Sequence, residues 1–313
     1  MTMAEPLVII RMDGGICSQI CFAALGRWFA RNGAAVRYDL EWFRKYGRDL
    51  DGLHPRPFEL PLAFPSLDFP EASPEEIRLY AERHSRNGRP LDQCRPPVYI
   101  DGYPEEQQRI LLELRGLFQQ AFQPTDLAEI GELLAQIAER PACAVHIRRG
   151  DLAEYCGPYG APPRAEYFRQ AMQCASTQLP GVRFFLFSDE PAWVQRELLP
   201  RLAPHPCTVV QHQDATRGHL DLYAISRCQA IIASQGSFGA TAKILAPRNP
   251  TLIVPREYPL LGQELGGVRL IADPETVPNS RPAPSRLQRL FSIRRHRGGL
   301  LLTILGRRLF LHR

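Results

Sequence analysis

Residues 144 to 152 read AVHIRRGDL, and this stretch decides how the chain is expected to fold. An apolar run that begins at residue 142 ends here in a histidine, two arginines, a glycine and an aspartate. A short apolar run that stops at a turn is typical of a buried strand. In parallel sheets, ligands bind beyond the carboxyl ends of the strands. The two arginines are therefore either an ordinary salt-bridged turn or a site that holds an anion.

The sequence after this stretch repeats the same pattern of buried strand and amphipathic helix. Besides 142–147, strands are predicted at 183–188, 207–211, 229–233 and 251–254. Helices are predicted between them, around 164–178, 191–201, 217–227 and 237–246. This alternation, with nearly continuous apolar strands, indicates a doubly wound parallel sheet.

The first half of the chain opens with a similar unit. LVIIRM at 7–12 predicts a strand, and a glycine turn leads into a helix that stops at Asn32. VRYDL at 36–40 predicts the next strand, which completes a βαβ unit. The fold class is therefore α/β.

The stretches between these elements are less regular. The Pro-rich segment 51–75 is expected to be an irregular loop, and 98–103 a short strand. A helical tract at 105–139 breaks near Pro124 and restarts at a cap formed by Thr125 and Asp126. We expect three parts: an N-terminal α/β domain over residues 1–140, a C-terminal α/β domain over 141–280, and a basic amphipathic tail over 281–313.

The net charge of +5 is unevenly distributed. The tail holds nine arginines and no acidic residue, so residues 1–280 carry a net charge of −4. That balance argues against nucleic-acid binding, which needs a positive surface over the body. Basic residues interleaved with Leu, Ile and Phe often lie on an anionic membrane surface. A terminal helix docked on the body, or a disordered basic end, would show the same pattern.

Other features of the composition bear on the compartment. No apolar stretch is long enough to cross a bilayer, and the start lacks the pattern of a signal peptide. We expect a cytoplasmic protein that attaches peripherally to the inner membrane surface through its tail. The eight cysteines include no C-x-x-C pair, which favours buried free thiols over disulfides or zinc.

Four polar clusters follow predicted strands, at 13–15, 146–151, 188–190 and 234–237. Their convergence on one sheet edge would be stronger evidence for a site than any one of them. Arg148 and Arg149 offer planar, charged donors that suit phosphate oxygens. Gly150 would let the backbone approach a ligand, and Asp151 could hold an arginine in place.

The last cluster leads into a helix. Ser234, Gln235 and Ser237 would surround free backbone N–H groups that attract an anion, although plain N-capping would use the same residues. Asp221, ahead of the strand at 229–233, could bind a base or ribose, or face solvent. No D-x-D motif stands where a divalent metal would be held, so no metal or other cofactor is expected.

The order of these clusters resembles the bacterial α-1,2-fucosyltransferase family, glycosyltransferase family 11, whose donor motif α-1,6-fucosyltransferases share. VHIRRGD matches the family's H-x-R-R-x-D motif, and YIDGYPEEQQRIL resembles the segment before it. FLFSDEPAWV is similar to F-S-D-D-x-x-W, and DLYAISRCQAIIASQGSF to a block that ends in N-S-S-F. The first loop, GGICSQICF, keeps two glycines and a glutamine of the family's G-G-L-G-N-Q-x-F-Q.

The resemblance implies a GT-B-like fold, with two Rossmann-like domains facing a cleft and the N-terminal domain on the acceptor side. It implies inverting, metal-independent transfer of L-fucose from GDP-fucose to a glycan hydroxyl, the 2-OH of galactose in this family. Arg148 would stabilise the charge on departing GDP. The other substrate-binding residues that it implies are Gly14, Gly15, Gln19, His146, Arg149, Asp151, Ser188, Asp189, Asp221, Ser234, Gln235, Ser237 and Phe238.

Inversion requires a base for the acceptor hydroxyl. Asp13, beside the glycine turn, is the expected base, and Glu154 is the other candidate. The basic tail suits an acceptor that is lipid-linked, as in bacterial O-antigen or capsule synthesis. Two other functions stay open: a transferase of the same fold that uses another nucleotide sugar, such as GDP-mannose, and a non-catalytic basic protein that binds membrane or nucleic acid.

Overall fold

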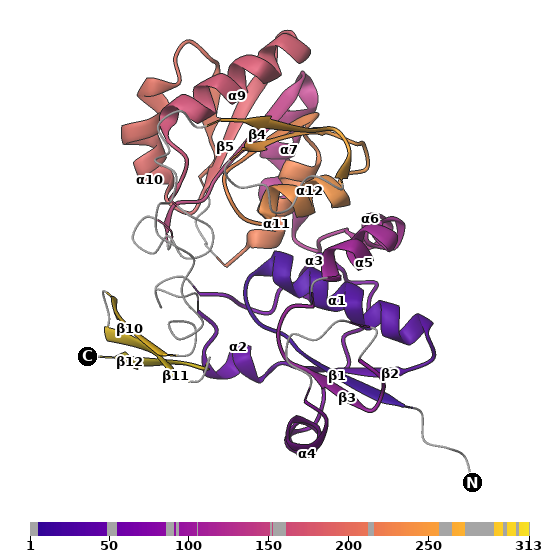
Figure 1. Ribbon diagram of the computed structural model, residues 1–313. Coiled ribbons are helices and arrows are strands. Elements are labelled where there is room, and N and C mark those ends of the chain that lie inside the picture. The colour runs from indigo at the N-terminus through magenta and orange to yellow at the C-terminus, as the bar shows by residue number, and fades with distance from the viewer. Residues whose placement is uncertain are drawn as a thin grey trace.

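The computed structural model contains two parallel sheets, one above the other in Figure 1. It describes residues 6–48, 55–85, 91, 94–104, 106–150, 152, 161–211, 216–256 and 265–272, together with the backbone of 291–296, 299–304 and 307–312. The predicted α/β class is confirmed. The strands of one sheet precede residue 140 in the sequence and those of the other follow it, and the predicted domain boundary lies at that position.

The N-terminal sheet has the order β2-β1-β3 (Ala35–Asp39, Leu7–Arg11 and Val98–Ile100), and its strands are parallel. Helix α1 (Ile16–Arg31) follows β1 after the predicted glycine turn. Gly14 has a φ of +74°, a left-handed conformation that favours glycine, and it lets the chain reverse into α1. Helices α2 (Glu41–Lys45) and α4 (Pro74–His84) lie around this sheet.

The C-terminal sheet has the order β6-β5-β4-β7-β8-β9 among the described residues. Its strands are parallel and span Cys207–Val209, Arg183–Ser188, Ala142–Ile147, Ala230–Ala233, Thr251–Pro255 and Val268–Ile271. The helices are α9 (Ala165–Gln178), α10 (Pro191–Trp193), which continues as π and 3₁₀ turns to Arg201, α11 (Gly218–Ser226) and α12 (Phe238–Leu245).

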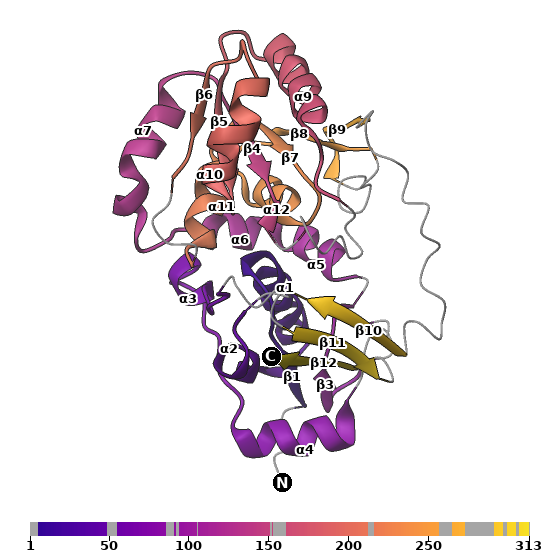
Figure 2. The same ribbon diagram turned by 90° about the vertical axis from the view of Figure 1, so that its left-hand side faces the viewer.

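Helices α1, α5 (Gln107–Glu113) and α6 (Arg115–Ala121) lie between the two sheets in both ribbon views (Figures 1 and 2). The amide of Gln119 in α6 donates to the carbonyl oxygens of Ile244 and Ala246, each at 2.8 Å, and so binds the end of α12. Buried apolar side chains of both sheets belong to one continuous core. The two halves are therefore packed against each other over these helices.

Some connecting elements differ from the predictions. The Pro-rich segment contains the short helix α3 (Leu60–Ala63), and α4 begins at Pro74. Helix α4 starts with a capping box, in which Ser73 and Glu76 satisfy each other's backbone N–H groups. The sequence S-P-E-E at 73–76 contains this capping signal, but the many prolines of the segment favoured the prediction of a loop.

The tract 105–139 breaks as predicted, but its restart differs. After α6 a 3₁₀ turn (Leu127–Ile130) leads into α7 (Gly131–Glu139). Asp126 occupies the predicted N-cap position of this restart, but its carboxylate makes no capping hydrogen bond and binds His219 and Arg217 instead. The carboxylate is more stable in an ion pair with Arg217 and a hydrogen bond to the buried His219 than in a hydrogen bond to a neutral backbone N–H.

The tail contains three strands, β10 (Phe291–His296), β11 (Gly299–Ile304) and β12 (Arg307–His312). They pair antiparallel in the order β10-β11-β12. A terminal helix over these residues, one of the alternatives left open, is therefore excluded. Strand β9 was also not predicted. Its residues, VRLI, are half-buried or exposed in the sheet, so its sequence lacks the continuous apolar run that marks a buried strand.

Candidate functional site

The candidate site lies where the order of the C-terminal strands reverses. The chain runs from β4 outward through β5 to β6, then returns to the other side of β4 for β7, β8 and β9. Crevices beyond such a switch point are the usual ligand sites of parallel sheets. Arg148 follows β4 and Ser234 follows β7, and the Arg148 N–H donates to Ser234 Oγ at 2.9 Å. The two clusters predicted at these strand ends therefore come together.

Arg148 lies directly against the turn after β7. Gly236 has a φ of +100°, and a Cβ added there would lie 3.5 Å from Arg148 Nη1. The glycine thus permits the turn, and the guanidinium lies within contact distance of it. Ser237 precedes the first residue of α12 and makes no side-chain capping bond. It directly follows Gly236, so the start of this helix lies close to the turn that Arg148 contacts. Charged and backbone N–H donors therefore meet at one place.

Two side chains here carry buried polar atoms that no described residue satisfies. Gln235 is 2% exposed, and neither its amide nitrogen nor its oxygen has a partner. His146 Nδ1 is also buried without a partner. Leaving such groups unsatisfied costs about 1–3 kcal/mol each. Polar atoms of this kind beside Arg148 indicate that a polar ligand completes the site.

His146 is held by an aromatic contact. Its ring stacks on Phe238, with centroids 4.6 Å apart and planes 5° from parallel. Burial, and secondarily the nearby Arg148 charge, lower the pKa of His146 to about 3. The imidazole is therefore neutral at ordinary pH and can both donate and accept one hydrogen bond.

Arg149 is turned toward the segment after β5. Its N–H donates to Asp189 Oδ1 at 3.0 Å, and its Nε lies 2.8 Å from Glu190 Oε2. The guanidinium also lies 4.1 Å above the ring of Trp193. Ser188 Oγ accepts from the Glu190 N–H at 3.0 Å. These contacts assign the segment 188–190 a scaffolding role and point Arg149 away from Gly236.

An open pocket of about 340 Å³ lies beside Arg149. Its lining residues are Arg149, Glu190, Pro191, Ala192, Trp193 and Arg196. The pocket combines two guanidinium groups with one carboxylate and one indole. Arg149, which lines this pocket, directly follows Arg148 of the switch point in the chain.

Asp13 stands at the end of β1 in a polar group. The Tyr103 hydroxyl donates to its Oδ1, and Arg11 binds Asp101 at 2.8 Å close by. Burial raises the pKa of Asp13, and the Tyr103 bond and the Arg11 charge oppose this only in part. A carboxylate with a raised pKa is a better proton acceptor than an ordinary one.

The first loop meets the C-terminal half through helix α1. Thr241 of α12 and Ser237, just before that helix, hydrogen-bond the sulfur of Cys17, whose pKa burial raises to about 12. Gln19 is fully buried and binds only backbone: its Nε2 donates to the carbonyl oxygens of Gly14 and Pro57, and its Oε1 accepts from the Glu59 N–H. Gln19 therefore shapes the loop and leaves no polar atom for a substrate.

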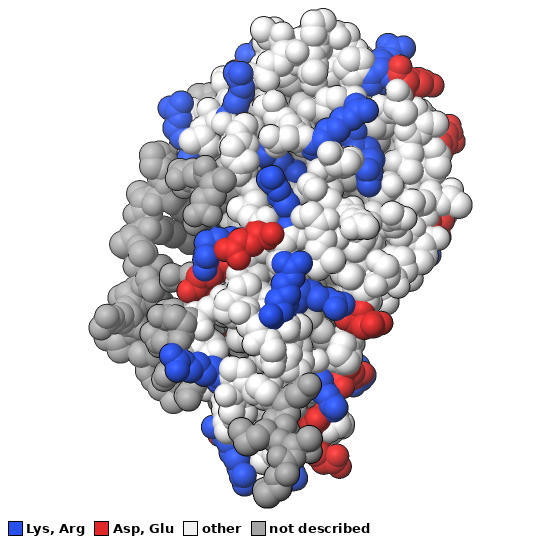
Figure 3. All heavy atoms as spheres, turned by 90° about the vertical axis from the view of Figure 1, so that its right-hand side faces the viewer, with Lys and Arg blue, Asp and Glu red and all other residues white. Residues whose placement is uncertain are grey.

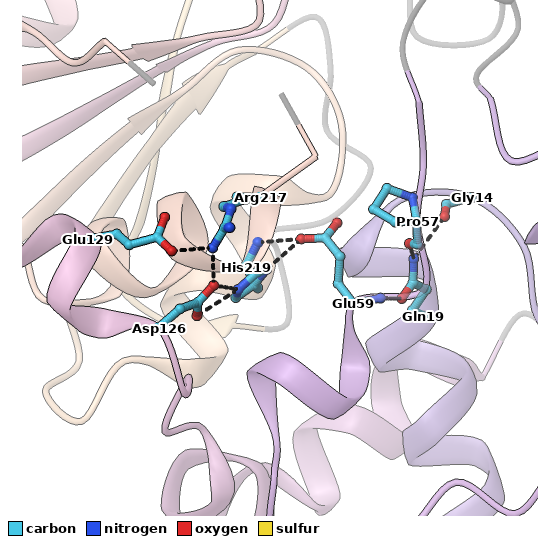
Figure 4. A network of polar contacts seen from close by, with 8 residues as sticks. All are labelled: Gly14, Gln19, Pro57, Glu59, Asp126, Glu129, Arg217 and His219. Carbon is cyan, nitrogen blue, oxygen red and sulfur yellow. Dashed lines mark hydrogen bonds and ion pairs between the residues drawn. The ribbon is translucent and has the colours of Figure 1, made fainter. Parts of the chain in front are cut away.

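A chain of polar contacts crosses from this loop to the C-terminal half (Figure 4). Glu59 Oε2 accepts from both the N–H and Nδ1 of His219, at 2.8 and 2.7 Å. His219 Nε2 lies 3.1 Å from Asp126 Oδ1. Arg217 Nη1 then binds Asp126 at 2.5 Å and Glu129 at 2.6 Å. We call these five residues, Glu59, Asp126, Glu129, Arg217 and His219, the bridging network.

The bridging network controls the charge of its histidine. Burial lowers the pKa of His219, but the hydrogen bonds and charges of Glu59 and Asp126 outweigh burial and raise it. A ring flanked by carboxylates on both nitrogens is held as the imidazolium, which donates from both.

The structure thus brings together His146, Arg148, Ser234, Gln235, Ser237 and Phe238. Asp221 lies on α11, two residues after His219 of the bridging network. Asp151 and the alternative base Glu154 lie outside the described residues. Sequence reasoning missed Glu59, Tyr103, Arg217 and His219. A glutamate beside a proline-rich run and a histidine inside R-G-H carry no local signal of contact.

The described residues contain neither a metal-binding cluster nor a membrane-spanning helix. Nowhere in this part of the chain do three His, Cys, Asp or Glu side chains converge as metal ligands would. Of the helices seen here, none has both the length and the apolar character to span a bilayer.

The chain is similar to known glycosyltransferases. The family model described as Glycosyl transferase family 11 matches residues 90–260, more than half of the chain. No curated protein matches significantly. Among solved structures, NodZ alpha-1,6-fucosyltransferase soaked with GDP-fucose is 17% identical, with a TM-score of 0.44, over 79% of this chain and 97% of that one.

Two further solved structures are similar at the same level. A mutant of Arabidopsis thaliana FUT1 in complex with GDP is 12% identical, with a TM-score of 0.45, over 81% of this chain and 70% of that one. E. coli ADP-heptose lps heptosyltransferase II is 13% identical, with a TM-score of 0.46, over 84% and 89%. Likenesses this remote carry no argument about the site.

Proposed function

The chain belongs to glycosyl transferase family 11, and on that premise we propose that it transfers L-fucose from GDP-fucose to a glycan hydroxyl, the 2-OH of galactose. The family match confirms the resemblance that the motifs indicated. The proposed reaction inverts the anomeric carbon and requires no metal. Its acceptor is an oligosaccharide, and its setting is bacterial O-antigen or capsule synthesis.

One observation carries the donor site. Arg148 meets Ser234, Gly236 and the unsatisfied amide of Gln235 at the strand switch point. A nucleoside diphosphate would supply acceptor oxygens for the unsatisfied Gln235 amide and negative charge for the Arg148 guanidinium. Charge-assisted hydrogen bonds of this kind contribute about 1.5–3 kcal/mol each. Arg148 would also stabilise the negative charge that develops on GDP as the sugar leaves.

The other roles follow from position. His146, neutral and stacked on Phe238, offers ring nitrogens for the nucleoside together with Asp221. Asp13 supplies the base, because burial raises its pKa and the loop that carries it packs toward α12. Without a metal, Arg148 and the start of α12 would carry the leaving-group charge. Arg149 supports this site through the backbone it shares with Arg148.

The alternatives differ in what they require. A transferase that uses GDP-mannose would use the same diphosphate site, so only comparison of donors separates it from the proposed enzyme. A nucleic-acid-binding protein would need a continuous basic surface. On the face in Figure 3, basic side chains of the described residues stand in small groups among acidic and uncharged ones, which disfavours that function.

A nucleotide panel tests the donor class. We expect GDP to raise the thermal midpoint of the wild-type protein, and UDP, ADP and CMP to leave it unchanged. A ligand that binds only the folded state stabilises it by about 2.7 kcal/mol at a hundredfold excess over its Kd. Turnover of GDP-fucose and GDP-mannose, measured side by side as GDP release, then separates the two donors. A shift with UDP or CMP in place of GDP would contradict fucosyl transfer.

The tail supports a second part of the proposal, peripheral attachment to the cytoplasmic face of the inner membrane. Its nine arginines, without acidic residues, would be attracted to anionic lipid. We expect the protein to sediment with vesicles that contain phosphatidylglycerol, at low salt, and a variant that lacks residues 281–313 to stay in the supernatant. Equal sedimentation of both proteins would refute a role of the tail in membrane binding.

A further inference from the structure

The bridging network has no place in donor binding or in chemistry, yet it places four buried or half-buried polar residues and the exposed Glu129 at one interface. We propose that Glu59 and His219 are positioning residues, which hold the glycine loop of the N-terminal sheet in place relative to the donor-binding helices. This inference rests on the proposed transferase function. It concerns residues that neither the family motifs nor the donor site assigns.

The first half of the path ties the glycine loop to Glu59. Gln19 Nε2 donates to the Gly14 carbonyl oxygen at 3.1 Å, and Gln19 Oε1 accepts from the Glu59 N–H at 2.9 Å. Gln19 has no exposed surface, so its amide cannot exchange these partners for water. Any displacement of Glu59 is therefore passed to the turn beside Asp13 (Figure 4).

The second half of the path ties Glu59 to helix α11. Its carboxylate accepts from the His219 backbone N–H in the first turn of the helix, where a negative charge is favoured. A Cβ added at Gly218 would lie 3.4 Å from Glu59 Oε1, so the carboxylate packs directly against the start of this helix. Helix α11 carries Asp221 and packs against α12, which begins at the donor site.

The charge of the imidazole decides whether the path is complete. His219 faces Glu59 from the segment before α3 and Asp126 from the segment before the 3₁₀ turn, and Arg217 and Glu129 flank Asp126. The imidazolium donates to both carboxylates. A neutral ring has one N–H, so its other nitrogen would present a lone pair to a carboxylate. Deprotonation therefore breaks one of the two side-chain bonds.

The pairing of these buried groups within the protein argues against direct contact with substrate. His219 is 0% exposed and Glu59 is 4% exposed, both ring nitrogens of His219 are paired, and Glu59 Oε2 already accepts two hydrogen bonds. Loss of the network should therefore leave GDP binding intact and misplace the glycine loop. A displacement of about 1 Å in a catalytic group can lower the rate about 100-fold.

The test uses His219→Gln and Glu59→Gln in the full chain, with His84→Gln, on α4 and outside the network, as the matched control. Three quantities are measured: the Kd of GDP by calorimetry, kcat for GDP release from GDP-fucose across pH, and hydrogen exchange of the Gly14 and Gly15 amides. We expect both network variants to keep the GDP Kd within about threefold of the wild-type value, about half of a tenfold step in free energy. Their kcat should fall about 10- to 100-fold, and the loop amides should exchange faster.

The pH profile provides a readout that a purely structural role would not change. Wild-type kcat should fall at alkaline pH as His219 loses its proton, because its pKa is raised above the ordinary value. In His219→Gln this alkaline decline should be absent. In Glu59→Gln the alkaline decline should move to lower pH, because the variant lacks the Glu59 carboxylate, which raises the pKa of His219 more than Asp126 does.

Other results would overturn the proposal. Wild-type kcat and loop exchange in both variants would show that the network positions nothing. Parallel losses of GDP affinity and kcat would show that it only supports the donor site. If His219→Gln fails to fold, the isosteric Glu59→Gln decides. If wild type turns over no nucleotide sugar, the proposed function fails, whereas loop exchange in the variants still tests the network.

Discussion

Replacing Arg148 by alanine is expected to lower kcat/KM for GDP-fucose roughly 100- to 1,000-fold, the usual effect of removing one preorganised donor from a developing oxyanion. The guanidinium lies against Gly236, next in the chain to the unsatisfied Gln235 amide, at the place proposed for the diphosphate. The same variant should lose the thermal shift with GDP. Both effects are measured at equal concentrations of folded protein.

Two controls accompany this variant. Arg148→Lys keeps the charge but loses the planar fork, so it should recover part of the GDP affinity and little of kcat. Arg83→Ala removes an exposed arginine at the end of α4 and should behave as wild type. Wild-type GDP affinity in Arg148→Ala would place the diphosphate elsewhere and remove the main support for the donor site.

Replacing Asp13 by asparagine is expected to lower kcat about 100- to 10,000-fold, the range that a general base contributes. GDP should still bind, because Asp13 belongs to the N-terminal sheet and the donor site to the C-terminal one. Catalysis requires the carboxylate, so wild-type kcat should rise with pH through a pKa above the ordinary aspartate value. This rise is followed as kcat for transfer against pH.

Tyr103→Phe provides the matched control for the base. The Tyr103 hydroxyl lowers the pKa of Asp13, so its removal should move the acidic limb of the profile to higher pH and leave the plateau rate largely unchanged. An Asp13→Asn variant that transfers fucose at the wild-type rate would assign the base to another residue. An acidic limb unaffected by Tyr103→Phe would show that the limb reports another group.

Five of the six described strands of the C-terminal sheet could be predicted to within two residues, and β9 was missed. Strands β4 and β5 match the predicted ranges 142–147 and 183–188, because strands buried on both faces are continuous apolar runs with polar residues at their ends. The clusters at those ends converge as expected, since parallel strands present their carboxyl ends at one edge. Arg148, Ser234 and Ser237 were therefore accessible from local pattern and motif alone.

The partners of each side chain were not accessible in the same way. Glu59 and His219 are 160 positions apart, and no local pattern records that α3 and α11 meet. Arg149 has the same sequence character as Arg148, but an ion pair with Glu190 and the face of Trp193 direct it to a separate pocket. Local sequence determines which segments become strands and helices, because burial periodicity and turns act over a few residues. Contacts between distant segments determine which polar groups bind substrate and which hold the two halves together.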